Sequence, residues 1–284
     1  MSNPSGFLVI DKPAGITSHD VVAKIRKRFA TKRVGHAGTL DPMATGVLVL
    51  GVGIATKLLQ FIVAGTKRYE ATIRLGIRKT TDDREGETIS QVDANHLSDQ
   101  EIKSALTNFV GLIQQVPSSV SAIKVDGKRA YELVRAGATV ELAARPVEIS
   151  ELKVIEIHRA EHLEIDIEVA CSAGTYIRAI ARDLGDALGV GGHLVSLRRT
   201  LVAPFAIDNA AGMEDAPLLP VVDVISEVLP TRELNEVEVS ELRFGRKITA
   251  TGKVGTIAAI HANELVALIS DDANGAQPVS VFNP

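Results

Sequence analysis

Apolar residues along the chain follow two patterns that predict different kinds of β-strand. Unbroken apolar runs occur at residues 7–10 and 47–50. The first run predicts a strand, and the second predicts either a buried strand or the core side of a helix. Apolar and polar residues alternate at 67–76 and 163–171. Alternation of this kind is typical of strands that bury one face and leave the other in water.

Helical spacing appears where the sequence also carries capping signals. Thr17 is followed three residues later by Asp20, which has the form of a capping box, and apolar residues then recur at helical spacing up to residue 29. The segment 97–101 repeats this signal and predicts a helix to about residue 110. We expect Thr175 to cap a further helix over residues 176–188.

The chain has a different pattern from about residue 203 to its end. Four prolines and little periodicity mark residues 203–231, so a linker is expected near the end of that segment. Short apolar runs follow at 255–261, 264–269 and 278–282, after a helical stretch at 234–244. These patterns predict a large domain over residues 1–225 and a small β-rich domain over residues 232–284.

Composition is that of an ordinary globular protein, with 45% hydrophobic and 23% charged residues among 284. The single cysteine, Cys171, excludes an internal disulfide framework and fits a reducing compartment. The N-terminus lacks the features of a signal peptide, and no apolar stretch approaches the roughly 18 residues of a membrane span. We therefore expect a cytoplasmic protein that does not enter the membrane.

Charge is distributed unevenly along the chain. Residues 1–80 hold 13 Lys and Arg against 4 Asp and Glu, a net charge of +9, whereas the remainder has a net charge of −13. Much of the positive charge follows Asp20, on the polar face of the first predicted helix and just beyond it: Lys24, Arg26, Lys27, Arg28, Lys32 and Arg33. A basic face of this kind suits a polyanion such as RNA, and a merely solvated helix face is the alternative.

Three side chains stand out as candidates for chemistry. Asp41 precedes a proline in a glycine-containing stretch, where it is either a turn residue or a rigidly held nucleophile or base. Tyr69 lies on the apolar face of a predicted strand and could pack in the core or stack under a base. Arg178 falls in the first turn of a predicted helix, against the helix dipole, so we expect a carboxylate or phosphate partner.

Other chemistries find little support in the sequence. The chain has no zinc-ligand spacing, no P-loop and no Gly-x-Ser-x-Gly elbow, and His158 and His162 have no third ligand nearby. The pair Gly51 and Gly53 lacks the rest of a dinucleotide-binding fingerprint. We expect no metal and no cofactor, and an enzyme that binds a nucleotide through this glycine pair is a weaker alternative.

Residues 35–46, GHAGTLDPMATG, resemble the catalytic motif of the TruB-type tRNA pseudouridine synthases. Four further segments resemble motifs of that family in the same order. They are Asp-Lys-Pro-x-Gly at 11–15, Lys-x-Tyr at 67–69, Cys-Ser-x-Gly-Thr-Tyr-Ile-Arg at 171–178, and residues 191–200. The resemblance covers roughly residues 6–205.

The resemblance implies an α+β fold, in which a mixed, largely antiparallel central sheet is flanked by helices (the pseudouridine synthase fold). It also implies a small β-rich, PUA-like RNA-binding domain at the C-terminus. Residues 116–148 would be an RNA-clamping insertion. Here the chain departs from the commonest family pattern, since Ser118 and Val120 replace a proline and a tyrosine. The departure puts an aromatic contact from this insertion in doubt.

The function implied is the isomerisation of uridine 55 in the TΨC arm of tRNA to pseudouridine, by a monomer that needs no cofactor. The target base must leave the stack before it can react. By resemblance the catalytic residues are Asp41, Tyr69 and Arg178. The implied substrate- and RNA-binding residues are His36, Lys12, Tyr176, Leu197, Asp83 and Arg199, with Lys12 bracing the site.

Two other readings stay open. A non-catalytic RNA-binding or tRNA-folding module could share the scaffold and the basic surface, but it would not need Asp41, Tyr69 and Arg178 together. The second alternative is a guide-RNA-dependent relative of the same fold. The shortness of the terminal segments disfavours it.

Overall fold

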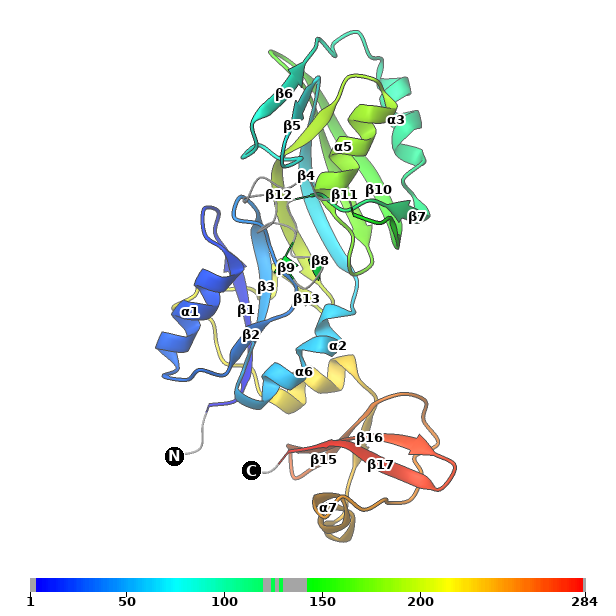
Figure 1. The fold of residues 1–284 in the computed structure, drawn as a ribbon. Helices are drawn as coiled ribbons and strands as arrows, with labels where there is room; N and C mark the ends of the chain where they lie inside the picture. Colours follow the sequence, from blue (N-terminus) through cyan, green and yellow to red (C-terminus); the bar gives the residue numbers. More distant parts are fainter. Residues whose placement is uncertain (1–3, 120–123, 126–127, 130–141, 283–284) are drawn as a thin grey trace.

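A computed structural model describes residues 4–119, 124–125, 128–129 and 142–282. Within these residues a nine-stranded sheet forms the body of the molecule, in the order β1-β3-β12-β4-β11-β10-β7, with β2 and β13 pairing at its side (Figure 1). Its strands are β1 (Gly6–Lys12), β2 (Val34–His36), β3 (Thr45–Val52), β4 (Lys67–Leu75), β7 (Gly111–Gln115), β10 (Arg145–Arg159), β11 (Leu163–Cys171), β12 (Gly192–Val202) and β13 (Phe205–Ala206). Only the pairing of β12 with β3 is parallel among these described strands, which confirms the mixed, largely antiparallel sheet.

Helices and short sheets surround this sheet. The helices are α1 (Ser18–Arg28), α2 (Leu59–Val63), α3 (Asp99–Thr107), α5 (Ile177–Ala187), α6 (Val221–Val228) and α7 (Glu236–Arg243), with 3-10 turns η1 (Gly53–Lys57) and η2 (Ile207–Asn209). Two small hairpins are β5 (Ile77–Lys79) with β6 (Thr88–Gln91), and β8 (Lys124–Val125) with β9 (Lys128–Arg129). Most of the expected insertion at 116–148 lies outside the described residues.

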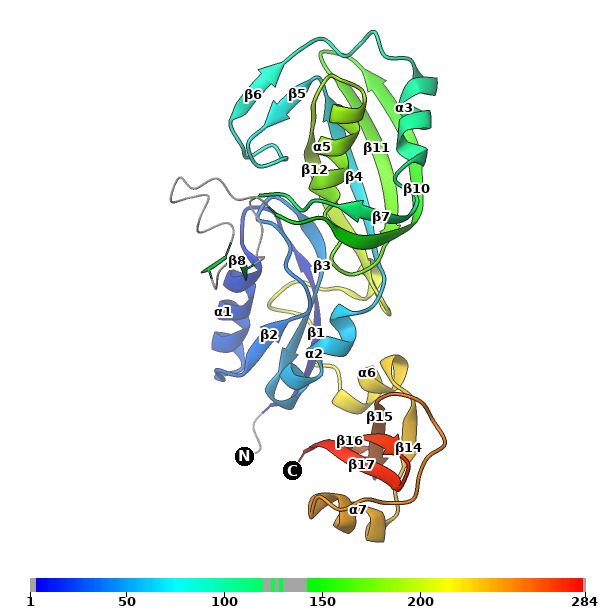
Figure 2. The ribbon, with the colours of Figure 1, turned by 45° about the vertical axis from the view of Figure 1, so that its right-hand side comes forward.

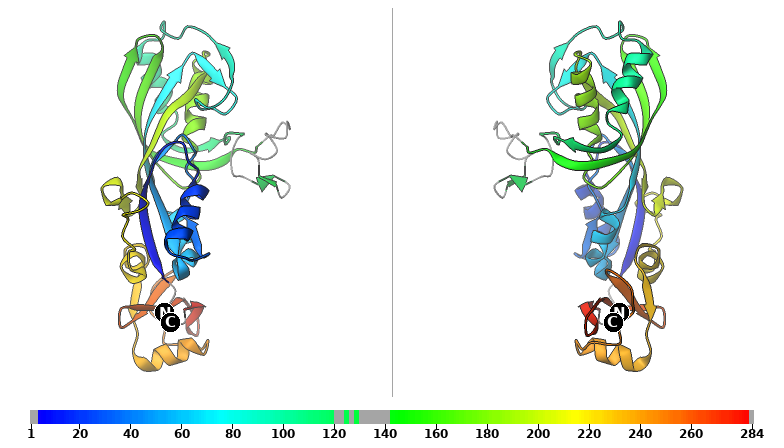
Figure 3. Two further views of the ribbon diagram at one scale, coloured as in Figure 1. Left: turned by 90° about the vertical axis from the view of Figure 1, so that its left-hand side faces the viewer. Right: turned by 90° about the vertical axis from the view of Figure 1, so that its right-hand side faces the viewer.

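The two apolar patterns of the sequence correspond to two kinds of burial. Strands β1 and β3 are buried on both faces, because α1 covers one face while α2 and α6 cover the other. Strands β4 and β11 bury alternate residues under α5 and leave the opposite face polar. Figure 3 shows α1 and α5 on the same side of the sheet. Strands covered on both faces read as continuous apolar runs, as at residues 47–50.

Two of the predicted helix caps are confirmed and one is wrong, although all three helices begin within one residue of the predicted start. Thr17 and Ser98 each form the predicted capping box, with Asp20 and Glu101 respectively. The second of these helices ends at Thr107, three residues before the predicted end. Thr175 does not cap α5: its hydroxyl donates to the carbonyl of Ser172 (3.0 Å), and Tyr176 occupies the N-cap position without a side-chain cap.

A second sheet lies at the far end of the molecule, beyond α6 (Figure 2). Its order is β14 (Thr231–Glu233), β15 (Ile257–His261), β16 (Glu264–Asp272) and β17 (Gly275–Val281). Helix α6 and this sheet share one apolar cluster with β1 and β3, which includes Phe7, Ile225, Ile260 and Phe282. None of the helices in the described ranges is long and apolar enough to cross a membrane.

Candidate active site

The loop between β2 and β3 carries Asp41 and is fixed by hydrogen bonds on both sides of it. The Ser18 hydroxyl accepts from the amide of Leu40 (2.9 Å) and donates to the carbonyl of the same residue (3.1 Å). The carbonyl of Pro42 accepts from the amide of Gly15 (2.8 Å). Because both neighbours are held, the backbone at Asp41 has little freedom to move.

Lys12 lies beneath the same loop and is fully buried. Its Nζ donates to the carbonyls of Pro13 (2.9 Å) and Ile16 (2.8 Å) and lies 3.4 Å from that of Pro42. Burial lowers the pKa of Lys12 to about 8, and the nearby Asp41 partly opposes this shift. The structure therefore places Lys12 as a brace under the loop and gives it no surface that RNA could reach.

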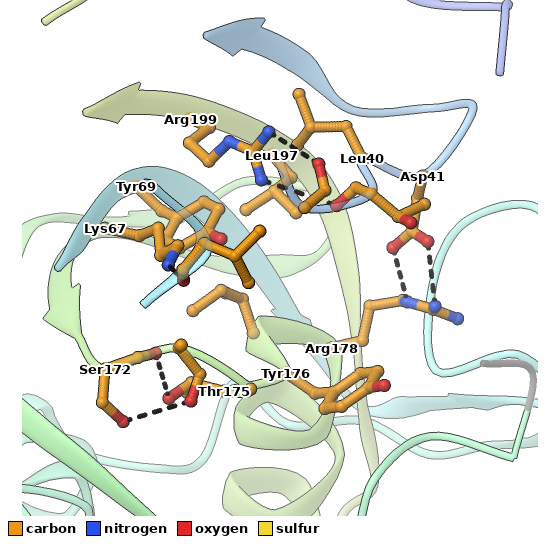
Figure 4. A pocket seen from close by; sticks show the side chains of 16 residues that line it. Leu40, Asp41, Lys67, Tyr69, Ser172, Thr175, Tyr176, Arg178, Leu197 and Arg199 are labelled. Carbon is orange, nitrogen blue, oxygen red and sulfur yellow. Dashed lines mark hydrogen bonds and ion pairs between the residues drawn. The ribbon is translucent and has the colours of Figure 1, made fainter. Parts of the chain in front are cut away.

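Asp41 and Arg178 form a bidentate ion pair (Figure 4). Arg178 Nε lies 2.9 Å from Asp41 Oδ2, and Arg178 Nη2 donates to Oδ1 over 3.1 Å. The arginine side chain is 5% exposed, whereas that of Asp41 is 30% exposed. The guanidinium is thus a buried support, and the carboxylate keeps an open side on which another molecule can react.

Arg178 has two further partners in the loop that follows β5. Its Nη1 donates to the carbonyl of Thr81 (3.0 Å) and lies 3.4 Å from Asp83 Oδ2. Asp83 is itself held by the Thr81 hydroxyl (2.6 Å) and the amide of Glu85 (3.0 Å). Asp83 is 3% exposed, so it supports Arg178 from below and does not lie at an RNA-facing surface, where we expected it.

Arg199 is also a buried support, although we expected it near RNA. The residue is only 2% exposed. Its Nε donates to the carbonyl of Val47 (2.8 Å) and its Nη2 to that of Gly38 (3.2 Å). Arg199 pairs with Tyr69 across β12 and β4 and also influences the ionisation of the Tyr69 phenol. It therefore connects the Asp41 loop to the strand that carries Tyr69.

A cavity of about 250 Å³ opens beside Asp41. Its walls include Tyr69, Tyr176 and Leu197, which offer two rings and an aliphatic side chain to a planar ligand (Figure 4). Burial raises the pKa of the Tyr69 phenol, and Arg199 partly opposes this shift. The phenol therefore stays protonated near neutral pH and is a poor base there.

The structure brings six of the nine predicted site residues to this cavity: Asp41, Tyr69, Tyr176, Arg178, Leu197 and Arg199. His36 ends β2 just before the Asp41 loop, and its ring packs edge-on against His19 at 5.6 Å. Tyr176 is fixed through its backbone, which exchanges two hydrogen bonds with the Gln115 side chain (2.8 and 3.1 Å). Lys12 and Asp83 lie behind the cavity wall.

Lys67 lines the same cavity, although it was expected only as part of the Lys-x-Tyr motif and not as a site residue. It is 5% exposed and lies two residues before Tyr69, on the same face of β4. Its Nζ donates to the carbonyls of Val63 and Gly65. The signal in the sequence was the position of this lysine in an alternating strand. It shares a face with the apolar residues of the strand, and this position predicts a buried charge.

Exposed positive charge lies on α1, which packs beside β2. Lys24 and Lys27 are free of ion pairs within the described residues, whereas Arg26 and Arg28 also donate to backbone carbonyls. Among the residues that the structure describes, no group of three or more His, Cys, Asp or Glu is placed to hold a metal ion.

Three family models match the chain. Residues 26–177 match the TruB family pseudouridylate synthase N-terminal domain, which is more than half of the chain. Residues 178–218 match the tRNA pseudouridylate synthase B C-terminal domain, and residues 229–283 match the tRNA pseudouridine synthase II C-terminal model.

Similar proteins and structures agree with these matches. The chain is 51% identical to a tRNA pseudouridine synthase B of Mycobacterium leprae, over 98% of this chain and 91% of that protein. It is 50% identical to the protein of that name from Corynebacterium diphtheriae, over 99% and 97%. A solved H/ACA ribonucleoprotein bound to a substrate RNA contains a chain with a TM-score of 0.69 and 25% identity, covering 98% of this chain and 85% of that one.

Proposed function

The chain belongs to the TruB family of pseudouridine synthases, and we propose that it converts uridine 55 in the TΨC arm of tRNA to pseudouridine. The relatives supply the reaction and the class of RNA. Position 55 and the TΨC arm are not part of the relatives' names, and they are what we propose.

The observation that carries the proposal is the Asp41–Arg178 pair at the edge of the cavity. A carboxylate in this place can attack the ribose, attack the ring, or remove a proton during elimination, and each route requires it to be ionised and oriented. The bidentate arginine holds the carboxylate in one orientation. An RNA-binding or RNA-folding module would have no need to bury Arg178 and Asp83 behind one partly exposed carboxylate.

The cavity suits a uracil that has been flipped out of the helix. Tyr69 and Leu197 offer flat and aliphatic surfaces, and stacking of a base on an aromatic ring contributes about 1–3 kcal/mol. This would offset the few kcal/mol that unstacking costs. Because its phenol stays protonated, we propose that Tyr69 stacks on the uracil and donates a hydrogen bond. It does not act as a base while it carries its own proton. We propose that His36, beside the loop, fills the place that the base leaves.

The enzyme would act as a monomer in the cytoplasm, with tRNA as its partner. The basic face of α1 would contact phosphates, and the C-terminal sheet would add a second RNA surface. Identity of 51% and 50% to tRNA pseudouridine synthase B proteins, against 25% to the chain of the H/ACA ribonucleoprotein, favours an enzyme that acts without a guide RNA.

Site-specific detection of pseudouridine tests the proposal. A tRNA transcript is incubated with the wild type, and the modified position is mapped by carbodiimide labelling and primer extension. The expected result is a single stop that reports position 55, and a transcript with cytidine at that position should give none. Modification at another uridine, with position 55 unchanged, would refute the assignment of the site.

A further inference from the structure

Lys67 is a buried ammonium group without a counter-ion. Its side chain lines the cavity and the residue is 5% exposed. Its hydrogen-bond partners are the neutral carbonyls of Val63 and Gly65. Within the described residues no carboxylate lies in ion-pair distance of Lys67, and none contributes to its ionisation. Burial of an unpaired charge is costly, so its presence here requires an explanation.

The two other cations of the cavity are already committed. Arg178 is paired with Asp41 and Asp83, and Arg199 donates to backbone carbonyls of the catalytic loop and β3. Lys67 differs from Arg178 because no acid balances its charge, and it shares this property with Arg199. Arg199 donates to three backbone carbonyls, whereas the Lys67 ammonium has three N–H donors and donates to two carbonyls. Of these two cations, Lys67 is therefore the better placed to respond to a negative charge that appears in the cavity during reaction.

A structural role for Lys67 is the competing explanation. The carbonyls that it contacts lie at the end of α2 and just after it, where a lysine can satisfy helix carbonyls and interact with the helix dipole. Such a role does not require burial, since capping lysines keep their ammonium group in water at little cost. It also does not account for the position of Lys67 on the cavity wall beside Tyr69.

We propose that the Lys67 ammonium contacts the flipped uracil and stabilises the negative charge that forms on its carbonyl oxygens. This inference rests on the proposed function. When the bond between N1 and C1′ breaks, its electron pair stays on the uracil and the charge spreads to the ring oxygens. If Asp41 adds to C6 instead, electrons move to the oxygen on C4. The same cation stabilises the charge on either route.

The proton balance of the reaction does not involve Lys67. The electron pair of the uracil forms the C5–C1′ bond, and any bond that Asp41 has made to C1′ or C6 breaks, so that the negative charge returns to its carboxylate. C5 then loses its proton and N1 gains one. Lys67 keeps its protons throughout and acts as a fixed positive charge. Its protonation state is therefore a requirement for rate, and the reaction should slow when the group loses its proton.

The surroundings of Lys67 fix the pH range of that effect. Burial and, to a smaller extent, the charge of Arg199 on β12 lower the pKa of Lys67 to about 8, and Cys171 on β11 partly opposes this shift. Tyr69 shares its face of β4, and burial raises the pKa of that phenol. Asp41 and Arg178 face it across the cavity. The rate should therefore decrease as the pH rises through about 8.

Single-turnover rates with saturating enzyme test the inference. We expect Lys67→Met to slow pseudouridine formation about a hundredfold, the effect of removing one charge-stabilising donor, with tRNA affinity changed less than about threefold. Lys67→Arg should retain more activity than Lys67→Met and lose the decrease above pH 8. Lys103→Met, at an exposed position of α3, is the matched control and should react like the wild type.

A Lys67→Met rate within about threefold of wild type would overturn the inference. If that variant does not fold, the wild-type profile decides: a rate that is constant from pH 7 to about 9.5 would overturn it, and a decrease through about pH 8 would support it. A wild type that forms no pseudouridine at any pH would instead refute the proposed function.

Discussion

Arg178 is the residue on which the geometry of the site depends most. It connects Asp41 to Asp83 and to the carbonyl of Thr81, and it is almost completely buried. The buried charge of this arginine is compensated by two acids together, and removal of either acid would leave part of it uncompensated. The two acids therefore hold the guanidinium in one orientation. The open carboxylate of Asp41 is therefore oriented by an acid that the substrate does not reach.

Asp83→Asn should slow the reaction without weakening tRNA binding. The variant keeps the shape of the side chain but removes the charge behind Arg178, so the ion pair with Asp41 loses its rear support. A loss of about 1.4 kcal/mol of transition-state stabilisation corresponds to a tenfold lower rate. Single-turnover rates and filter binding measure the two quantities. Asp186→Asn, at the far end of α5, is the control. If Asp83→Asn weakened tRNA binding by as large a factor as it lowered the rate, the account would be contradicted.

Lys67→Met should make the folded protein more stable at neutral pH while it lowers activity. The pKa of Lys67 is about 8 in the folded state, against 10.5 for an ordinary lysine. Between those values the unfolded chain binds a proton that the folded chain lacks, so wild-type stability rises with pH, by at most about 1.4 kcal/mol per unit. The advantage of the variant should thus shrink between about pH 8 and 10.5 in denaturant titrations.

The opposite outcome is equally informative. A Lys67→Met variant that is less stable than wild type, by an amount independent of pH, would mean that Lys67 mainly caps α2. That result would contradict the view that its buried charge is kept for the reaction.

At this scale the sequence identified the residues with chemical signals. Asp41 before proline and Arg178 against a helix dipole were recognisable, and the family motif supplied their roles. Burial was the part that could not be derived. Asp83 and Arg199 were expected near the RNA, but the folded chain buries both, and it also buries Lys12, which was expected to brace the site.

Among the elements, α5 fixes the position of Arg178 through close packing of backbone. Gly185 faces residues 191–192, and a Cβ at this position would lie 2.1 Å from Gly191 C and Gly192 N. No side chain can be added there unless α5 moves away from β12. The helix therefore needs this glycine in order to hold its first turn against the catalytic loop.

Gly185→Ala should lower the free energy of unfolding by about 1–3 kcal/mol, as overpacking of a dense core does. Gly212→Ala is the matched control, since its added Cβ would meet only the Asp215 side chain at 3.5 Å. Urea titrations of both variants measure the difference. Equal stabilities would show that α5 adjusts freely and would refute its role as a fixed support.

Two long strands that the sequence did not reveal, β10 and β12, both carry bulges. β12 has register shifts between Leu194 and Ser196 and between Arg199 and Leu201, and β10 has two similar shifts. Each bulge reverses the alternation of buried and exposed residues. A period of two is then lost within one strand, whereas β11 has no shift against β4 and was predicted with its observed bounds.

For the whole molecule, the charge asymmetry of the sequence predicts how RNA binding depends on salt. Lys24 and Lys27 are exposed on α1 and have no structural partner among the described residues. If both contact phosphates, replacing them with alanine should reduce the slope of log affinity against log salt by about two. Affinities of the double variant and of Lys103→Ala from 50 to 300 mM salt measure this, and an unchanged slope would place the RNA elsewhere.

The division into two units is less sharp than the proline-rich stretch suggested. The predicted boundary at residue 225 lies within α6 (Val221–Val228), and the apolar cluster around Ile225 includes residues of both sheets. Domain limits at 225 and 232 therefore remain a prediction. Sequence periodicity reveals the strands of the second sheet but not the surface that they share with β1 and β3.

Release of tritium from tRNA labelled at C5 of uridine is the most direct test of the central claim, that Asp41 in this cavity isomerises a uridine. Bond formation at C5 expels the label, so release reports the reaction itself. We predict release by the wild type, none by Asp41→Asn, and tRNA binding by both. Equal release from the two proteins, or binding without release by the wild type, would contradict the account.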